Sequence, residues 1–514
     1  MNYKLLGRIL GKIMIMEGFL MMLPLIVSFI YKEPIQNKIA FVIPMALLVI
    51  LGGLMQIPQP KRTSLYQKEG FAIVGLVWII MTLFGAIPFT INREIPNYID
   101  ACFEMMSGFT TTGASIINDV TALSYSSLFW RSFSHWIGGM GILVFVLIFI
   151  PESNDGSSMH LLRAESPGPK VGKIASKMKV TARILYLIYL CLTISEILVL
   201  ICDKNMLPEP YANDRIFYSI LASLGSAGTG GFGFVPNSME LLSPFAQYTI
   251  SIFLIMFGCN FALYYLILLG KIKEVFRSEE FRAYGIMIIT SITIIFVSLY
   301  TKMQEIYSVE EAFRHSLFQV ASIITTTGYT TTNYNLWPEI TKAVLVILMF
   351  VGAMAGSTAG GIKISRIVMA VKGSYINVRK LINPRYVPKA KFEGKSLEEK
   401  TTNDVFAFIS MYLGIMLIAI LLVSFDPING TTASTALVTD TGLDQPTHGF
   451  FSNFSAVLSC ISNIGPGFEA VGPYSNFSGY NSFSTLVLTF TMLLGRLEIL
   501  PILILFNHRT WKKI

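Results

Sequence analysis

Four short segments of this chain share one pattern: each is a run of small or polar residues that ends in glycine between long apolar stretches. They are Thr110-Thr111-Thr112-Gly113, Gly228-Thr229-Gly230-Gly231, Thr325-Thr326-Thr327-Gly328 and Ser462-Asn463-Ile464-Gly465. Glycine permits backbone conformations closed to other residues, so that successive carbonyl groups can point the same way. Four such segments around one axis can replace the water shell of a small cation with backbone oxygens. The pattern therefore predicts a chain that folds around a pore.

The apolar stretches place this pore in a membrane. Only 14% of the 514 residues are charged, against about a quarter in soluble proteins, and several stretches exceed the roughly 20 residues needed to span a bilayer. Spans are predicted near 10–30, 39–56, 70–91, 127–150, 180–202, 244–269, 283–301, 340–371, 403–425 and 483–507. We expect a polytopic membrane protein with a single membrane domain.

The distribution of charge predicts the orientation. Lys and Arg gather in connections on one side, including the tract from Lys363 to Lys400, whereas acids such as Glu104 and Asp119 lie in connections on the other. The basic side should be cytoplasmic, and an even number of spans puts both termini there. The net charge of +8 thus belongs to loops that flank the membrane, and we expect no binding to nucleic acid.

Short apolar segments precede the four Gly-ended segments, at 98–109, 213–227, 309–324 and 451–461. They are too short to span a bilayer and suit half-helices that enter the membrane and return. The predicted fold class is an all-α membrane protein with four parallel repeats of helix, pore helix, filter and helix around a pseudo-fourfold pore. The expected divisions are an N-terminal two-helix extension at 1–68 and repeats at 69–150, 177–270, 280–372 and 401–514.

Backbone carbonyls can bind potassium whatever the side chain, so the filter can contain different residues in different repeats. The candidate potassium-binding residues are Thr110, Thr111, Thr112, Gly113, Thr229, Gly230, Gly231, Thr326, Thr327, Gly328, Ser462, Asn463, Ile464 and Gly465. Glu104 and Asp119 are either acids that concentrate cations at the mouth or ordinary solvated loop charges. The sequence leaves both interpretations open.

Small residues at 352–361, which include Gly356, Ser357, Thr358, Ala359, Gly360 and Gly361, interrupt the apolar run at 340–371. Each Gly costs a helix about 1 kcal/mol relative to Ala. Non-helical backbone at membrane depth survives only where protein buries it or where it lines a cavity, so these residues could form a gating loop beneath the filter. The alternative is a continuous helix whose small residues allow close packing.

Arg496 lies about midway along the last predicted span. A charge at that depth is costly and usually faces a cavity, a partner or an ion path. Glu498 is two positions away and would point to another helix face, which makes it a poor local partner. Arg496 is therefore either an electrostatic barrier below the filter or half of an ion pair with an acid on another helix.

Other chemistries lack the residues they need. The five cysteines and five histidines show no metal-ligand spacing, and we expect no metal except the transported potassium. Residues 228–233 match GxGxxG, but no strand precedes them and no βαβ unit surrounds them. No paired carboxylates, His cluster or activated nucleophile lies within the spans. We expect neither an enzyme nor a cofactor bound to this chain.

Six motifs together resemble the Trk/Ktr/HKT superfamily of potassium transporters, and specifically the TrkH type. They are TTTGA at 110–114, WRSFSHWIGGMGI at 130–142, TTTGY at 325–329, AGSTAGGIK at 355–363, SNIGPG at 462–467 and GRLEILP at 495–501. The resemblance covers nearly the whole chain, and the two leading helices favour the Trk type over the shorter Ktr type.

The resemblance implies potassium uptake by a homodimer in a bacterial inner membrane, with one pore per subunit. It assigns the filter glycines to Gly113, Gly231, Gly328 and Gly465, the gate to 352–361 and a pore-facing role to Arg496. It further implies a cytoplasmic TrkA-type partner ring, which binds the regulatory nucleotide (ATP, ADP or NAD). Segments 151–179 and 372–400 are the expected docking surfaces.

The selectivity and the energetics of transport stay open at the level of sequence. Sodium-selective relatives tend to have Ser at the first filter glycine, so Gly113 favours potassium. The alternatives are a mixed sodium and potassium pathway and a symporter coupled to protons or sodium.

Overall fold

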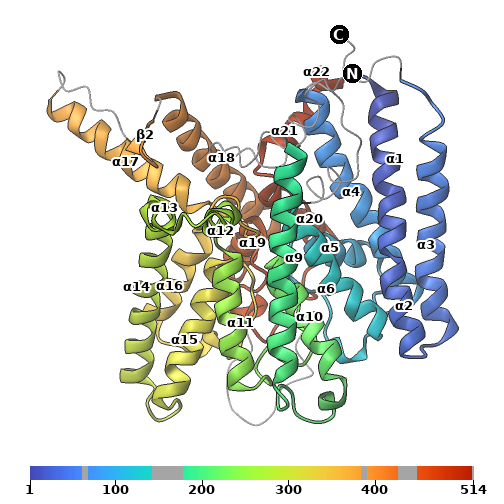
Figure 1. The fold of residues 1–514 in the computed structure, drawn as a ribbon, viewed down its shortest axis with the longest axis horizontal. Helices are drawn as coiled ribbons and strands as arrows, with labels where there is room; N and C mark the ends of the chain where they lie inside the picture. Colours follow the sequence, from blue (N-terminus) through green and yellow to red (C-terminus); the bar gives the residue numbers. More distant parts are fainter. Residues whose placement is uncertain (61–66, 142–177, 384–390, 398, 426–448, 512–514) are drawn as a thin grey trace.

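The computed structural model describes residues 1–60, 67–141, 178–383, 391–397, 399–425 and 449–511 (Figure 1). The described part is mainly helical, and it includes one short hairpin in which β1 (Lys391–Phe392) pairs antiparallel with β2 (Lys395–Ser396). The predicted docking segment 151–179 lies almost entirely outside the described residues, as does the end of the predicted span at 127–150.

Two helical spans stand at the edge of the molecule, outside the repeats (Figure 1). The first consists of α1 (Tyr3–Leu20) and α2 (Met22–Ile30), and the second is α3 (Ile35–Leu54). Small residues let α1 and α3 approach closely: a Cβ added at Gly11 would lie 2.6 Å from the Gly52 carbonyl oxygen, and the reverse substitution meets the Gly11 oxygen at 2.6 Å. Both α1 and α3 pack against the first helix of repeat 1.

Each repeat begins with a long helix and continues with a shorter one, and in repeats 2, 3 and 4 the helix that follows is interrupted. Repeat 1 contains α4 (Gln67–Ile91), α5 (Tyr98–Phe109) and α6 (Tyr125–Gly139); repeat 2 contains α9 (Met178–Cys202), α10 (Arg215–Gly228), α11 (Pro244–Phe257), α12 (Phe261–Leu268) and α13 (Ile272–Arg277). Repeat 3 contains α14 (Glu279–Lys302), α15 (Val309–Ile324), α16 (Glu339–Phe350) and α17 (Ile364–Ile382); repeat 4 contains α18 (Glu399–Val423), α19 (Phe450–Ser462), α20 (Ser482–Arg496), α21 (Leu500–Phe506) and α22 (His508–Trp511).

The four predicted pore helices are present as α5, α10, α15 and α19. Two of them, α5 and α15, have the predicted bounds. Local capping explains where they begin: the Asn97 side chain accepts from the Ile99 amide, and Ser308 and Glu311 form a reciprocal capping box at the start of α15.

The predicted spans at 244–269 and 483–507 are each interrupted in the structure. The chain bends by 90° between α11 and α12, and α20 ends at Arg496 because Glu498 and Ile499 have positive φ angles of 53° and 68°. The run at 340–371 is also divided, between α16 and α17. By length and composition, six helices in the described part can cross a membrane, or seven if the bent pair counts as one span.

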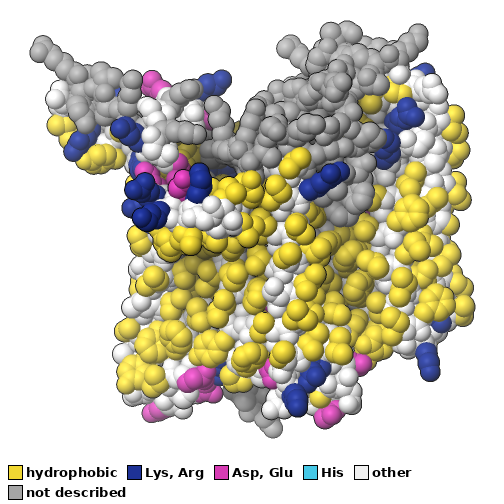
Figure 2. Space-filling model, viewed as in Figure 1, with side chains coloured by type: hydrophobic (Ala, Val, Ile, Leu, Met, Phe, Trp, Pro, Cys, Tyr) yellow, Lys and Arg dark blue, Asp and Glu magenta, His cyan; other side chains and the backbone are white. Residues whose placement is uncertain are grey.

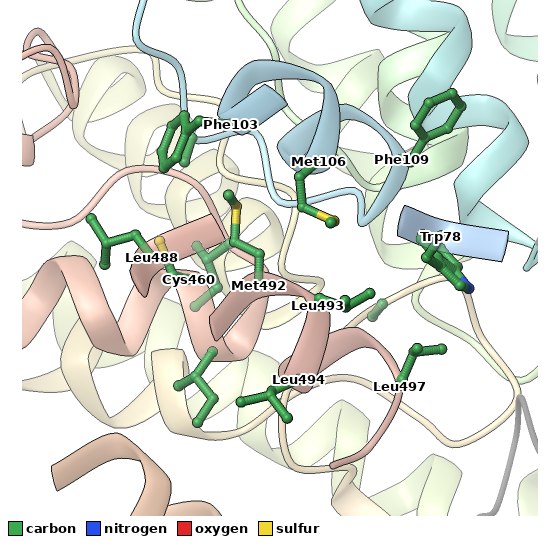
Figure 3. Packing of buried hydrophobic residues seen from close by; sticks show 14 of the residues in the cluster. Trp78, Phe103, Met106, Phe109, Cys460, Leu488, Met492, Leu493, Leu494 and Leu497 are labelled. Atoms are coloured by element: carbon green, nitrogen blue, oxygen red, sulfur yellow. The ribbon is translucent and has the colours of Figure 1, made fainter. Parts of the chain in front are cut away.

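Packing between repeats closes a ring. The helix that follows each Gly-ended segment contacts the pore helix of the next repeat: α6 packs on α10, α11 on α15, α16 on α19, and α20 on α5. Figure 3 shows the last of these contacts, where Phe103 and Met106 of α5 lie near Leu488 and Met492 of α20. Burial of these side chains packs repeat 4 against repeat 1, and this closure confirms the four-repeat arrangement.

The surface has the layering of a multi-pass membrane protein. Figure 2 shows hydrophobic side chains over a broad band of the visible face, with charged side chains mainly above and below it. The N-terminus and α22, the last helix of the described residues, lie at the same end of the molecule (Figure 1), where the Tyr3 hydroxyl donates to the Trp511 carbonyl.

Candidate functional site

The four Gly-ended segments share one backbone conformation. The residue two positions before the final glycine is left-handed in each, with φ of 56° at Thr111, 53° at Thr229, 54° at Thr326 and 58° at Asn463. The final glycines also have positive φ: 79° at Gly113, 73° at Gly231, 88° at Gly328 and 109° at Gly465. Non-glycine residues seldom adopt such angles, so their recurrence at one position in four sequences marks a shared, constrained geometry.

The final glycines bring the four segments together in a closed ring. A Cβ added at Gly113 would lie 2.0 Å from the carbonyl oxygen of Gly230, and one at Gly231 would lie 1.9 Å from that of Thr327. A Cβ added at Gly328 would lie 1.9 Å from the carbonyl oxygen of Ile464. One added at Gly465 would lie 2.7 Å from that of Thr112, in the first segment. Each glycine therefore faces the carbonyl just before the glycine of the next segment.

Hydrogen bonds of threonine hydroxyl groups, and of one asparagine amide, stabilise the segments. Thr110 Oγ1 donates to the Met106 carbonyl at 2.6 Å and lies 2.8 Å from Thr112 Oγ1. Repeat 3 uses the same arrangement, with Thr325 bonded to the Ala321 carbonyl at 2.6 Å and 2.8 Å from Thr327 Oγ1. In repeat 4, Asn463 Nδ2 donates to Thr112 Oγ1 at 3.0 Å, which ties the last segment to the first.

Glu104 is not a solvated acid at the mouth. Its side chain is fully buried and pairs with Arg131 of α6 at 2.8 Å. Glu104 Oε2 also accepts the Ile116 amide at 2.9 Å, and Arg131 donates to the Gly233 carbonyl at 3.2 Å. The pair thus fixes the backbone that follows the first and second Gly-ended segments, which end at Gly113 and Gly231. Asp119 is exposed, and hydrogen bonds from Thr121 lower the pKa of its carboxyl from the ordinary value.

His135 is a further site residue that sequence reasoning missed. Its Nδ1 lies 2.8 Å from the Gly108 carbonyl, and its Nε2 is 3.3 Å from the Phe232 amide. The amide can only donate, so Nε2 accepts and Nδ1 carries the proton. A Cβ at Gly228 would meet the His135 carbonyl oxygen at 2.3 Å. The motif at 130–142 contains both Arg131 and His135, but only the fold brings them to the segments.

A loop of residues 351–363, the α16–α17 loop, lies directly against the third and fourth Gly-ended segments, which are residues 325–328 (segment 3) and 462–465 (segment 4). The Gly360 amide donates to Thr326 Oγ1 at 2.6 Å, and a Cβ at Gly360 would lie 2.5 Å from the Ser462 carbonyl oxygen. Its two limbs are joined by a bond of 2.8 Å from the Gly352 amide to the Ile362 carbonyl. The chain here is therefore a loop, not the continuous helix that the sequence left open.

Arg496 joins the α16–α17 loop to repeat 1. Its guanidinium donates to the Thr358 carbonyl at 2.9 Å and to the Gly139 carbonyl at 2.8 Å, with a further bond to the Gly138 carbonyl. These glycines end α6, where helix carbonyls favour a cation. Glu498 instead pairs with Arg366 of α17, in agreement with its expected separation from Arg496.

The described residues contain no group of three or more His, Cys, Asp or Glu that could hold a metal ion. All five cysteines are free; Cys259 and Cys460 are buried. The site is therefore built from backbone carbonyls, hydroxyl groups and a few buried charges.

Comparisons with known proteins agree with this architecture. The family model described as TrkH, cation transport protein, matches residues 37–513. The chain is 32% identical over 524 residues to the Trk system potassium uptake protein TrkH of Escherichia coli K12, with all of both chains covered. It is 30% identical to TrkG of the same strain, covering 96% of this chain and 95% of that protein.

A solved structure is similar over the same length. The crystal structure of the potassium transporter TrkH from Vibrio parahaemolyticus matches with a TM-score of 0.83 and 29% identity, and 100% of each chain is covered. The helical membrane fold and the ring of four segments define a membrane transport protein. More specifically, the chain belongs to the TrkH family of cation transport proteins.

Proposed function

We propose that this chain takes up potassium through the ring formed by its four Gly-ended segments. The observation that carries the proposal is the closed sequence of contacts from Gly113 to Gly230, Gly231 to Thr327, Gly328 to Ile464 and Gly465 to Thr112. A ring of backbone carbonyls suits dehydrated potassium. Potassium also appears in the names of the relatives from Escherichia coli and Vibrio parahaemolyticus.

The α16–α17 loop and Arg496 are proposed as the gate. The loop touches segments 3 and 4 through Gly360, and Arg496 holds the loop carbonyl of Thr358 against the end of α6. A guanidinium on the path of a cation adds an electrostatic barrier. Opening would require release of the loop from these contacts.

Assembly is proposed to involve a second copy and a cytoplasmic subunit. The projecting part of α17 exposes Val371, Tyr375, Val378 and Ile382, which recur at helical spacing on one stripe (Figure 1). Such a stripe suits a homodimer contact. A TrkA-type subunit would dock on the basic cytoplasmic surface that includes segment 372–400, and the regulatory nucleotide would bind to that subunit.

The proposed location is a bacterial inner membrane, with both termini in the cytoplasm. The support is the position of α22 at the same end as the N-terminus, together with the Lys and Arg of the connections on that side.

Rubidium-86 uptake into liposomes that contain the purified chain tests the function, with unlabelled potassium or sodium as competitors. We expect competition by potassium and not by sodium, and no uptake into empty liposomes. Equal competition would favour the mixed-cation pathway. Uptake that requires an imposed proton or sodium gradient would favour a coupled symporter, and absent uptake, with or without the cytoplasmic subunit, would contradict the proposal.

A further inference from the structure

One carboxylate bonds both to the α16–α17 loop and to the first turn of α17. Glu280 Oε1 accepts the Ala355 amide at 2.7 Å, within the loop, and the Ser365 amide at 3.2 Å, in the first turn of α17. The residue before α17 is Lys363, and α17 has no side-chain cap of its own. Glu280 belongs to α14 and is only 6% exposed. It therefore supplies from another helix the anionic cap that α17 lacks.

The position of Glu280 depends in turn on a second carboxylate. Glu393 Oε1 accepts the Ser278 hydroxyl at 2.9 Å and the Glu280 amide at 3.1 Å, so it caps the N-terminus of α14. Glu393 and Gly394 form the two-residue turn between β1 and β2, with φ angles of 50° and 72°, as a tight hairpin turn requires. Glu393 itself is exposed.

The hairpin is also attached to α17. Lys372 Nζ donates to the Lys391 carbonyl at 2.7 Å and pairs with Glu279 at the start of α14. One surface hairpin thus contacts both the helix that carries Glu280 and the helix that continues the loop. A displacement of the hairpin would move the cap of α14 and the body of α17 together.

We infer that Glu280 is the positioning residue of the α16–α17 loop and that the exposed hairpin 391–396 controls the loop through Glu393. The inference rests on the proposed function of this loop as the gate. It adds a specific route. A displacement of the hairpin turn would move the first turn of α14 and, with it, Glu280, whose carboxylate would then keep or lose its hydrogen bonds to the Ala355 and Ser365 amides.

The test measures loop exposure and ion flux separately. A Ser357→Cys substitution places a thiol in the half-buried part of the loop, and a charged, membrane-impermeant thiol reagent reports its exposure; the chain without this substitution gives the background from native cysteines. Rubidium-86 flux is measured in the same liposomes. Glu393→Gln keeps the shape of the turn residue but removes the charge, and Glu280→Gln does the same at the loop.

We expect Glu393→Gln and Glu280→Gln each to raise the modification rate and the flux about threefold to tenfold, because charge-assisted hydrogen bonds become neutral ones. Glu274→Gln is the matched control, since Glu274 is exposed on α13 and its ion pair is with Lys271, which is also exposed. This control should change neither quantity. If Glu280→Gln fails to fold, the exposed Glu393 carries the test.

The outcomes separate the inference from the gate itself. Unchanged modification and flux in Glu393→Gln and Glu280→Gln, with increased flux in Arg496→Gln, would overturn the inference and leave the gate standing. Faster modification with unchanged flux would support the positioning role of Glu280 but contradict the loop as the barrier.

Discussion

The carboxylate of Glu104 and the guanidinium of Arg131 form an ion pair 2.8 Å apart, and both side chains are almost completely buried. One group comes from pore helix α5 and the other from α6, 27 positions later. Together they bind the Ile116 amide and the Gly233 carbonyl, which follow two different Gly-ended segments. This ion pair therefore stabilises the backbone next to the ring. Because both groups are buried, it does not serve to attract cations from solution.

Breaking this pair should be strongly destabilising. We expect Glu104→Gln or Arg131→Met alone to lower the free energy of unfolding by about 3–5 kcal/mol, because each leaves a buried charge without its partner. The double variant should lose less than the sum of the two. Thermal unfolding in detergent completes this double-mutant cycle, and strictly additive losses would show that the two groups are not coupled.

Gly113→Ser should reduce the preference for potassium over sodium. The new Cβ would meet the Gly230 carbonyl at 2.0 Å, and φ at this position is 79°, so the ring must distort. We expect a change in the ratio of at least about tenfold, equivalent to roughly 1.4 kcal/mol, in competition assays of rubidium-86 uptake. Gly414→Ser is the control, because a Cβ there meets nothing within 4 Å. An unchanged ratio in Gly113→Ser would argue against Gly113 as part of the filter.

Arg496→Gln should increase flux several-fold. The substitution removes the charge and the bonds that join the Thr358 carbonyl to those of Gly138 and Gly139. Arg496→Lys should be intermediate, because an ammonium keeps the charge but lacks the planar fork that reaches the α16–α17 loop and the end of α6 at once. Rubidium-86 efflux measures the difference, and Arg277→Gln, at an exposed position on α13, is the control. Reduced flux in a folded Arg496→Gln protein would contradict the barrier role.

Asp119→Asn tests whether the exposed acid concentrates cations. We expect the potassium concentration for half-maximal uptake to rise about twofold at low ionic strength and to be unchanged at 1 M salt, where the Debye length is only about 3 Å. Hydrogen bonds from Thr121 lower the pKa of Asp119 from its ordinary value, so the carboxyl should stay charged through the neutral and mildly acidic range, and the effect should be lost only in more strongly acidic solution. Asp404→Asn is the control, at an exposed position on the side predicted to be cytoplasmic. Equal effects of Asp119→Asn at low and high salt would exclude an electrostatic cause.

The pore helices and Gly-ended segments were predictable because their signals are local. Apolar length, the caps Asn97 and Ser308, and glycine at a left-handed position all act within a few residues. The breaks at 258–260 and 497–499 were missed because the surrounding residues are apolar enough to continue a span. A hydropathy pattern indicates which residues suit a membrane environment, but it does not indicate where the helix axis changes direction.

The class of fold, the number of repeats and the positions of the four segments could be predicted from the amino-acid sequence, because they follow from composition and short-range backbone preference. The tertiary structure alone decided which carbonyl each glycine faces, that Glu104 is paired and buried, and that Arg496 reaches Thr358, 138 positions away. These contacts arise only when the helices close the ring. The energy of a buried charge depends on the partners that closure brings to it, and no local pattern encodes those partners.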